Sequence, residues 1–204
     1  MFDFITIIDY IGTFAFAISG IRLASAKKFD WFGAYVVGLA TAIGGGTIRD
    51  ILLNKTPFWM QAPSYLIVTA FALGFVILFK KHLVRLSNTF FIFDTIGLGL
   101  FTVVGIEKSL AEGFPMWVAG IMGMITGSAG GVLRDVFINE EPLVFRKDIY
   151  ALTSVAGGII YYACLKIGLS DMLTQIFAAS GVLLSRVLAV KCHISLPILQ
   201  GDEK

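Results

Sequence analysis

Long apolar runs separated by short polar breaks occupy most of the chain. A helix that crosses the hydrocarbon core of a bilayer needs about 20 mostly apolar residues. Seven runs approach or reach that length, at residues 4–23, 31–53, 64–79, 90–106, 116–138, 149–167 and 172–190. Proline and charged residues interrupt the pattern between them, as at residues 55–57 and 140–142. We therefore predict an all-α polytopic membrane protein with seven transmembrane helices.

The composition agrees with this prediction and excludes other classes of protein. Of the 204 residues, 57% are apolar and only 15% are charged, whereas soluble domains carry about 25% charged residues. The net charge of +2 is too small for a nucleic-acid-binding protein, and the apolar content excludes a disordered chain. The cysteines Cys164 and Cys192 are interpreted as packing residues rather than as a disulfide or a metal pair.

Basic residues are distributed unequally between the two sides of the predicted membrane. Twelve of the 16 Lys and Arg residues fall on one side, and such an excess is typical of cytoplasmic loops. We expect the N-terminus outside and the C-terminus in the cytoplasm. Lys80, Lys81 and Arg85 form a cytoplasmic collar that is interpreted either as a weak binding site for anionic lipid head groups or as part of this bias alone.

The chain contains an internal duplication. Residues 9–57 align with residues 94–142 at a constant offset of 85 without a gap, and 17 of the 49 pairs are identical. Each copy holds three predicted spans, so the second copy must enter the membrane in the opposite direction. We predict an inverted repeat formed by residues 1–87 and 88–170, a seventh helix within 171–194 and a cytoplasmic tail at 195–204.

Glycine clusters lie within the second and fifth spans, at residues 44–46 and 129–131. Each glycine weakens a helix by about 1 kcal/mol relative to alanine, and freed backbone groups at membrane depth must face protein or water. We expect both helices to be kinked there and to surround an ion or substrate site; the alternative is close packing without a ligand. The candidate pore-lining or ion-binding residues are Thr41, Gly44, Gly45, Gly46, Thr126, Ser128, Ala129, Gly130 and Gly131.

Six charged residues fall within the apolar runs, where a charge costs about 2.5 kcal/mol or more unless it is paired or hydrated. They are Asp9, Arg49, Asp50, Asp94, Arg134 and Asp135. Similar depths in the membrane predict the ion pairs Asp9–Arg49 and Asp94–Arg134, one near each mouth, with Asp50 and Asp135 pointing elsewhere as second acceptors. These pairs are interpreted either as charged gates or as static links between helices.

The doubled motif at residues 44–50 and 129–135, GGGxxRD and AGGxxRD, together with the three-plus-three-plus-one arrangement, resembles the trimeric intracellular cation (TRIC) channel family. The likeness to its prokaryotic members, the glycine-rich membrane domain proteins, extends over roughly residues 4–190. It implies a homotrimer in a bacterial or archaeal plasma membrane, with a pore for K⁺ and Na⁺ inside each protomer. Animal relatives bind an inositol lipid through basic residues on the same two helices, where this chain offers Arg49 and Arg134.

Two functions follow as expectations. The first is a monovalent cation channel, and the second is a secondary transporter of a small zwitterion such as glycine, which some bacterial proteins of the same superfamily are proposed to carry. Both functions need a polar site near the membrane midplane. The sequence contains no phosphate-binding loop, zinc spacing or hydrolytic triad, so we expect no enzyme, no cofactor and no metal beyond permeant ions. Membrane lipids, and not nucleic acids, are the expected partners.

Overall fold

The computed structural model describes residues 3–85, 89–147 and 149–197, except for the side chains of residues 80–85. Its elements are α1 (Phe4–Ala26), α2 (Trp31–Leu52), α3 (Phe58–Gln61), α4 (Ser64–Arg85), α5 (Thr89–Ala111), α6 (Met116–Phe137), the 3₁₀ helix η1 (Leu143–Phe145), α7 (Leu152–Ile167) and α8 (Asp171–Lys191). Each predicted span corresponds to one of the longer helices. The side chains of Lys80, Lys81 and Arg85 lie outside the described part of the structure, so head-group binding there stays a prediction.

The long helices have the length and the surface of membrane-spanning helices. Five of those described, namely α1, α2, α5, α6 and α8, are long and apolar enough to cross a bilayer, while the apolar stretches of α4 and α7 are shorter. Large apolar side chains lie on the outer surface of the bundle: Phe32 is 76% exposed, Ile167 75% and Leu78 81%. A continuous apolar exterior of this kind is suited to contact with lipid or with another protein.

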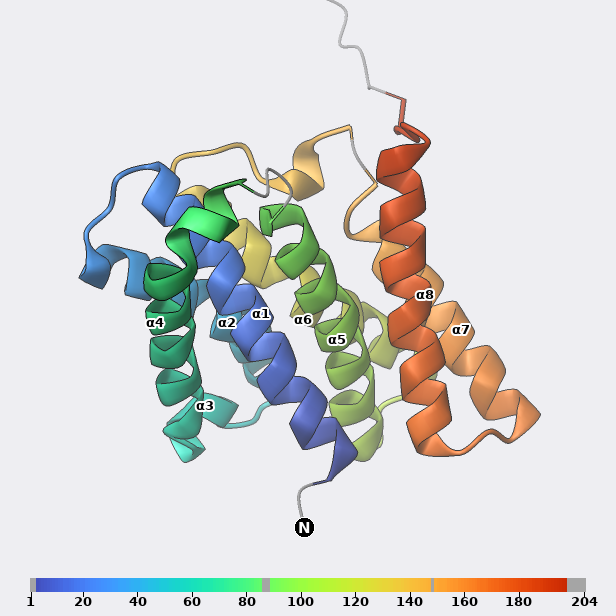
Figure 1. The fold of residues 1–204 in the computed structure, drawn as a ribbon. Helices are drawn as coiled ribbons and strands as arrows, with labels where there is room; N and C mark the ends of the chain where they lie inside the picture. Colours follow the sequence, from blue (N-terminus) through green and yellow to red (C-terminus); the bar gives the residue numbers. More distant parts are fainter. Residues whose placement is uncertain (1–2, 86–88, 148, 198–204) are drawn as a thin grey trace, which may run out of the picture.

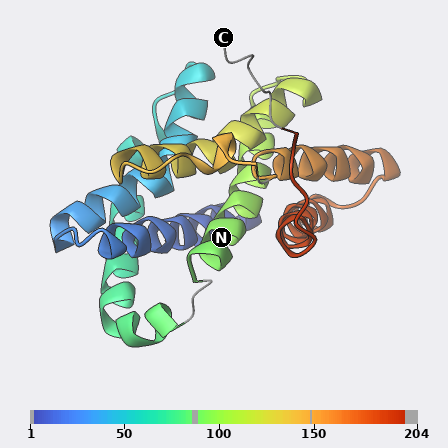
Figure 2. The same cartoon turned by 90° about the horizontal axis from the view of Figure 1, so that it is seen from above.

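The helices run up and down along a common direction. In Figure 1, α1 begins at the lower end of the bundle, α5 begins at the upper end, and α8 ends at the upper end. Figures 1 and 2 place α7 and α8 on one side of the molecule and α4 on the other. The centre consists of α1, α2, α5 and α6, where α1 packs on α2 and α5, and α6 packs on α5 and α2.

Corresponding positions of the duplication meet in the core between α1 and α5. The rings of Phe16 and Phe101, which are 85 residues apart, pack edge to face with centroids 5.1 Å apart and an interplanar angle of 80°. Gly12 leaves room for Phe101, and Gly97 leaves room for Phe16. In each helix, therefore, a glycine makes room for the phenylalanine of the other helix.

The same correspondence appears where the helices end. Asn54 follows α2 and Asn139 follows α6, and both adopt a left-handed backbone, with φ of 56° and 54°. Lys28 after α1 and Gly113 after α5 form a second pair at the same spacing, with φ of 63° and 81°. Asparagine and glycine tolerate this conformation better than other residues, so the sequence itself stops three of these four helices.

The structure does not confirm the kinks predicted at the glycine clusters. α2 is α-helical through residues 44–46, and α6 is α-helical through residues 129–131. The low helix propensity of glycine amounts to about 1 kcal/mol per residue, which tertiary packing can outweigh. The contacts that provide this packing also form the centre of the candidate site.

Candidate functional site

α2 and α6 cross with their backbones in direct contact. A Cβ atom added to Gly45 would overlap the carbonyl oxygen of Thr126, and one added to Gly130 would overlap the carbonyl oxygen of Thr41. Both glycines are buried. Positions 45 and 130 correspond in the duplication, and so do positions 41 and 126. The two contacts, Gly45 with Thr126 and Gly130 with Thr41, are therefore equivalent. A passage between α2 and α6 at this level would require the two helices to separate.

The remaining glycines of the clusters make room for side chains. A Cβ atom on Gly46 would lie 2.5 Å from Cε1 of Phe58, and one on Gly131 would lie 2.7 Å from the hydroxyl of Tyr150. Gly44 faces a flexible side chain of α6, that of Leu133. Ala129, which replaces the first glycine of the second cluster, is only partly buried.

The predicted hydroxyl ligands are engaged within their own helices. Thr41 and Thr126 each donate to the carbonyl oxygen four residues earlier at 2.6 Å, and Ser128 does so at 2.7 Å. The hydroxyl oxygens of the two threonines lie against Gly20 of α1 and Gly105 of α5. A pore-lining role for these residues stays a prediction.

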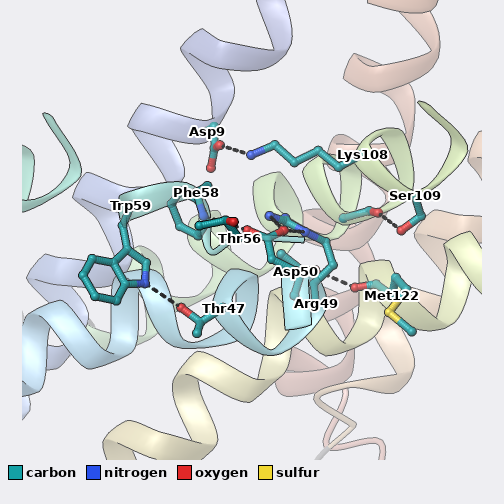
Figure 3. Close-up of polar contacts among 12 residues, drawn as sticks. Asp9, Thr47, Arg49, Asp50, Thr56, Phe58, Trp59, Lys108, Ser109 and Met122 are labelled. Atoms are coloured by element: carbon teal, nitrogen blue, oxygen red, sulfur yellow. Dashed lines mark hydrogen bonds and ion pairs between the residues drawn. The ribbon is translucent and has the colours of Figure 1, made fainter. Parts of the chain in front are cut away.

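A buried Arg-Asp pair lies at the lower end of α2. Arg49, only 1% exposed, donates from Nε and Nη2 to Oδ1 of Asp50 at 2.8 and 2.6 Å. The other carboxylate oxygen of Asp50 accepts the backbone N–H of Phe58 at 2.8 Å. The same carboxylate therefore neutralises the guanidinium and holds the start of α3 (Figure 3).

Asp9 of α1 completes what we call the lower cluster, consisting of Asp9, Arg49, Asp50, Tyr65 and Lys108. Asp9 accepts from Nζ of Lys108 at 2.7 Å (Figure 3). It also accepts from the hydroxyl of Tyr65 at 3.0 Å. The ammonium of Lys108 also lies 4.9 Å from the centre of the Phe58 ring, a cation–π contact. Two acids and two bases balance the formal charge of the lower cluster.

The corresponding pair at the upper end of α6 is more deeply buried. Arg134 has no exposed surface and donates from Nε to Asp135 Oδ1 at 2.8 Å, from Nη1 to the hydroxyl of Ser19 at 2.9 Å, and from Nη1 to Asp94. The backbone N–H of Leu143 donates to the second oxygen of Asp135 at 3.1 Å. Asp135 therefore holds the start of η1 as Asp50 holds the start of α3.

Tyr150 and Arg186 complete the upper cluster, which consists of Asp94, Arg134, Asp135, Tyr150 and Arg186. The guanidinium of Arg186 lies 5.0 Å from the centre of the Tyr150 ring and donates to the carbonyl oxygen of Ile149 at 2.7 Å. Among the described residues, Nη2 of Arg134, the hydroxyl of Tyr150 and Nε of Arg186 are buried without a hydrogen-bond partner. The upper cluster therefore contains buried donors without an acceptor, whereas the hydroxyl of Tyr65 in the lower cluster donates to Asp9.

The structure changes part of the predicted pairing. The expected Asp94–Arg134 ion pair is present, but Asp9 pairs with Lys108 and not with Arg49. The prediction that Asp50 and Asp135 point away from their neighbouring arginines is wrong. Each aspartate accepts a hydrogen bond from the arginine that precedes it on the same helix. Lys108 lies in the second copy only, since its counterpart in the first copy is Leu23.

Sequence reasoning missed the two tyrosines of the clusters. Tyr65 and Tyr150 are 85 residues apart, beyond the end of the aligned segments at residues 57 and 142. Extension of the same offset by eight residues would have found them.

Two exposed ion pairs connect the halves of the chain outside the helices. Nζ of Lys27 lies 2.5 Å from Glu140, and Nζ of Lys55 lies 2.6 Å from Glu112. Positions 27 and 112 correspond in the duplication, and so do positions 55 and 140. The two bridges are therefore equivalent contacts in which the signs of the charges are exchanged.

A cavity of about 380 Å³ opens at the lower cluster. Asp50, Phe58 and Lys108 line it, and the Lys55–Glu112 bridge lies at the same cavity. The site as a whole thus has a cavity lined in part by charged residues at one end, buried charge clusters towards both ends, and a closely packed helix crossing between them. This arrangement can attract and pass small charged solutes only if the crossing opens.

A family model described as glycine transporter matches the chain twice, at residues 6–81 and 91–166. The two matched segments are again offset by 85 residues. A UPF0126 membrane protein of Vibrio cholerae is 40% identical over 193 residues, which cover 94% of this chain and 81% of the relative. The UPF0126 inner membrane protein YadS of Escherichia coli K12 is 37% identical over 202 residues, 96% of each chain.

A solved structure has the same fold over nearly the whole chain. The TRIC trimeric intracellular cation channel orthologue from Rhodobacter sphaeroides superimposes with a TM-score of 0.87 at 31% identity, covering 93% of this chain and 98% of that chain. That relative is a channel and not an enzyme, in agreement with the expectation from the sequence.

Proposed function

Because this chain belongs to the glycine transporter family and shares its fold with a prokaryotic TRIC channel at 31% identity, we propose that it is a monovalent cation channel. It is an integral bacterial membrane protein, like its inner-membrane relatives. The observation that carries the proposal is the α2–α6 crossing, where Gly45 and Gly130 bring two helices together between a charged cluster at each end.

The pore, in this proposal, lies between the two halves of an inverted repeat. The exchanged contacts of Gly45 with Thr126 and of Gly130 with Thr41 support it, as do the opposite starting ends of α1 and α5 in Figure 1. Bending of α2 and α6 at their glycine clusters would move the backbones apart. Carbonyl and threonine oxygens of residues 41–46 and 126–131 would then be available to a partly dehydrated cation.

The two charge clusters act as gates in the same proposal. Each cluster holds both carboxylates and cations, so an entering cation can take the place of a guanidinium or ammonium group at a carboxylate only if that side chain moves away. K⁺ and Na⁺ as the permeant ions, the homotrimer with one pore in each protomer, and the outside N-terminus belong to the proposal as well. The solved relative is named a trimeric intracellular cation channel, which supports a permeant cation and a trimer.

Recording from the purified protein in planar bilayers tests this function. We expect unitary currents that reverse near the K⁺ equilibrium potential in a KCl gradient. Asp94→Asn removes the carboxylate that pairs with Arg134 and should change the open probability or the unitary current. Glu141→Gln, which changes an exposed side chain without an ion pair among the described residues, should leave the unitary current unchanged. The absence of unitary events from folded protein in all conditions would contradict the proposal.

A second candidate is a carrier of glycine, favoured by the description of the family model. Carriers also hold a midplane site between inverted repeats. Saturable uptake of glycine into proteoliposomes, coupled to an ion gradient and without unitary currents, would decide for the carrier.

A further inference from the structure

α6 and α7 enclose an apolar groove on the outer surface of the bundle. Its volume is about 520 Å³, and its walls include Met116, Trp117, Val155 and Tyr162. The described residues that line it are all uncharged. Trp117 is 70% exposed, so the groove opens outward among the apolar side chains that cover the bundle.

Two glycines line this groove where α6 and α7 approach each other. A Cβ atom added to Gly120 of α6 would meet no atom of another helix within 4 Å, and one added to Gly158 of α7 would meet only the Cα atom of Gly120, at 3.9 Å. Gly45 and Gly130 are different, because the α2–α6 crossing leaves no room for their side chains. The contact between α6 and α7 therefore does not explain why positions 120 and 158 are glycine.

The first half of the chain has large side chains at both positions. At the offset of 85, the counterparts of Gly120 and Gly158 are Tyr35 on α2 and Leu73 on α4. The hydroxyl of Tyr35 donates to the carbonyl oxygen of Leu66 at 3.1 Å, so this side chain spans the contact between α2 and α4. Leu73 packs against the apolar core. The fold thus accepts a tyrosine and a leucine where the second half has a groove.

The dimensions of the groove suit a single hydrocarbon chain. Two side chains take the equivalent place in the first half, so the groove has the width of a side chain, whereas a helix of another subunit is about 10–12 Å across. Between Met116 and Met124 the groove extends over eight residues of α6, which is about 12 Å at 1.5 Å per residue. This length corresponds to part of an acyl chain within one leaflet of the bilayer.

A basic residue lies at the lower mouth of the groove. Nζ of Lys166 lies 5.4 Å from the centre of the Tyr162 ring, and Tyr162 lines the groove. Lys166 is exposed and forms no ion pair within the part of the chain that the structure describes. It belongs to the last turn of α7, at the lower end of the bundle in Figure 1. Its ammonium group is therefore positioned for the phosphate of a lipid head group.

We propose that the α6–α7 groove binds an anionic phospholipid, with one acyl chain against Gly120 and Gly158 and the head-group phosphate at Lys166. Van der Waals contact with the walls holds the chain, since lipid tails are as apolar as the groove and the hydrophobic effect gives no net attraction. The charge of Lys166 selects the anionic head group. The site lies outside the α2–α6 crossing, so it does not rest on the proposed channel function.

Native mass spectrometry of the purified protein tests the site, with phosphatidylglycerol and phosphatidylcholine of identical chains added in equal amounts. The double variant Gly120→Tyr with Gly158→Leu copies the first half of the chain. It should fold and should lose a phosphatidylglycerol molecule that the wild type retains on each chain. Gly74→Ile is the control, because it copies the second half at a position of α4 outside the groove and should retain the lipid.

A change of charge separates the head group from the acyl chain. We expect the wild type to prefer phosphatidylglycerol over phosphatidylcholine by about five-fold, the effect of one lysine near an anionic head group. Lys166→Gln should keep lipid in the groove but abolish this preference. Lys191→Gln, the same change of charge at the end of α8 and at the opposite end of the bundle, should leave the preference intact.

Quenching of Trp117 fluorescence in reconstituted vesicles gives a second measurement that leaves the groove unchanged. In a variant with Trp31→Phe and Trp59→Phe, phosphatidylglycerol brominated in its chains should quench Trp117 more than brominated phosphatidylcholine at the same mole fraction. Lys166→Gln should remove the difference.

Three results would overturn the proposal. The first is equal binding of the two lipids by the wild type in both measurements, and the second is unchanged lipid retention by the folded glycine double variant. The third is a double variant in which only the number of associated chains changes, since the groove would then be a contact between copies of the protein. Neither measurement involves ion conduction, so the result is independent of the proposed function.

Discussion

At the scale of the residue, the absence of a side chain decides how closely two helices approach. Gly130 faces a carbonyl group of another helix, which is held in place by its own helix and cannot rotate away as a side chain can. Gly74 of α4 is also helical but has no atom within 4 Å of the position that a Cβ would occupy. The two glycines therefore form a matched pair for substitution.

We expect Gly130→Ala to reduce the free energy of unfolding by about 1–3 kcal/mol or more, because the added methyl group forces α2 and α6 apart. Gly74→Ala should be neutral or should stabilise the protein by up to about 1 kcal/mol, since alanine favours the helix. Thermal or denaturant unfolding in detergent measures both. Equal stability of the two variants would show that the crossing is not closely packed.

Charged residues mark the limit of sequence reasoning at this scale. Their presence within apolar runs indicated a site, and the symmetry of the chain indicated which positions correspond. The partner of Asp9 depended on a contact between α1 and Lys108 of α5, 99 residues away. Depth along a helix cannot distinguish Lys108 from Arg49, because it says nothing about which face of each helix meets the other.

At the scale of the element, the apolar pattern predicted the long helices because each run is bounded by proline, asparagine or charged residues. It did not predict α3 or η1. These short helices begin where backbone N–H groups reach the carboxylates of Asp50 and Asp135, and such tertiary capping has no local pattern. The kinks predicted at the glycines are not confirmed, for a related reason: close packing against a partner helix outweighs the low helix propensity of glycine.

The loops at the helix ends carry a prediction about pH. Lys27, by hydrogen bonding and by its charge, lowers the pKa of Glu140. The contribution of this bridge to stability is therefore complete above the usual carboxyl pKa of about 4.3 and disappears as the pH falls through the lower value of the folded state. We expect Glu140→Gln to lower the thermal midpoint at neutral pH and to match the wild type in acid.

A charge exchange separates this bridge from a general effect of charge. Lys27→Glu alone should destabilise the protein. The double variant Lys27→Glu with Glu140→Lys should recover part of the loss, because the new lysine would also lie near Arg146, which is 3.8 Å from Glu140. Glu141→Gln is the control, since Glu141 is exposed and has no ion pair among the described residues. Failure of the double variant to recover any stability would mean that the bridge does not form in solution.

At the scale of the whole molecule, the native cysteines offer a test of orientation. Cys192 is exposed just after α8, at the upper end of the bundle, and Cys164 is buried in α7. A membrane-impermeant thiol reagent should therefore modify Cys192 and leave Cys164 unmodified. With the proposed topology, labelling should occur in inside-out vesicles and be absent in right-side-out vesicles.

A second reporter defines the opposite face. In a variant without native cysteines, Glu112→Cys at the end of α5 should react from the outside only. Labelling of both positions from the same side of the membrane would contradict the three membrane crossings by α6, α7 and α8 that separate them in the proposed topology.

The exchanged bridges also determine which halves can associate. If two first halves were to pair in this geometry, Lys27 of one would meet Lys55 of the other; two second halves would bring Glu112 against Glu140. Like charges would then face each other at both ends, and only the mixed association places a base beside an acid at each. The exchanged charges thus favour pairing of a first half with a second half, a property that would guide correct assembly during insertion into the membrane.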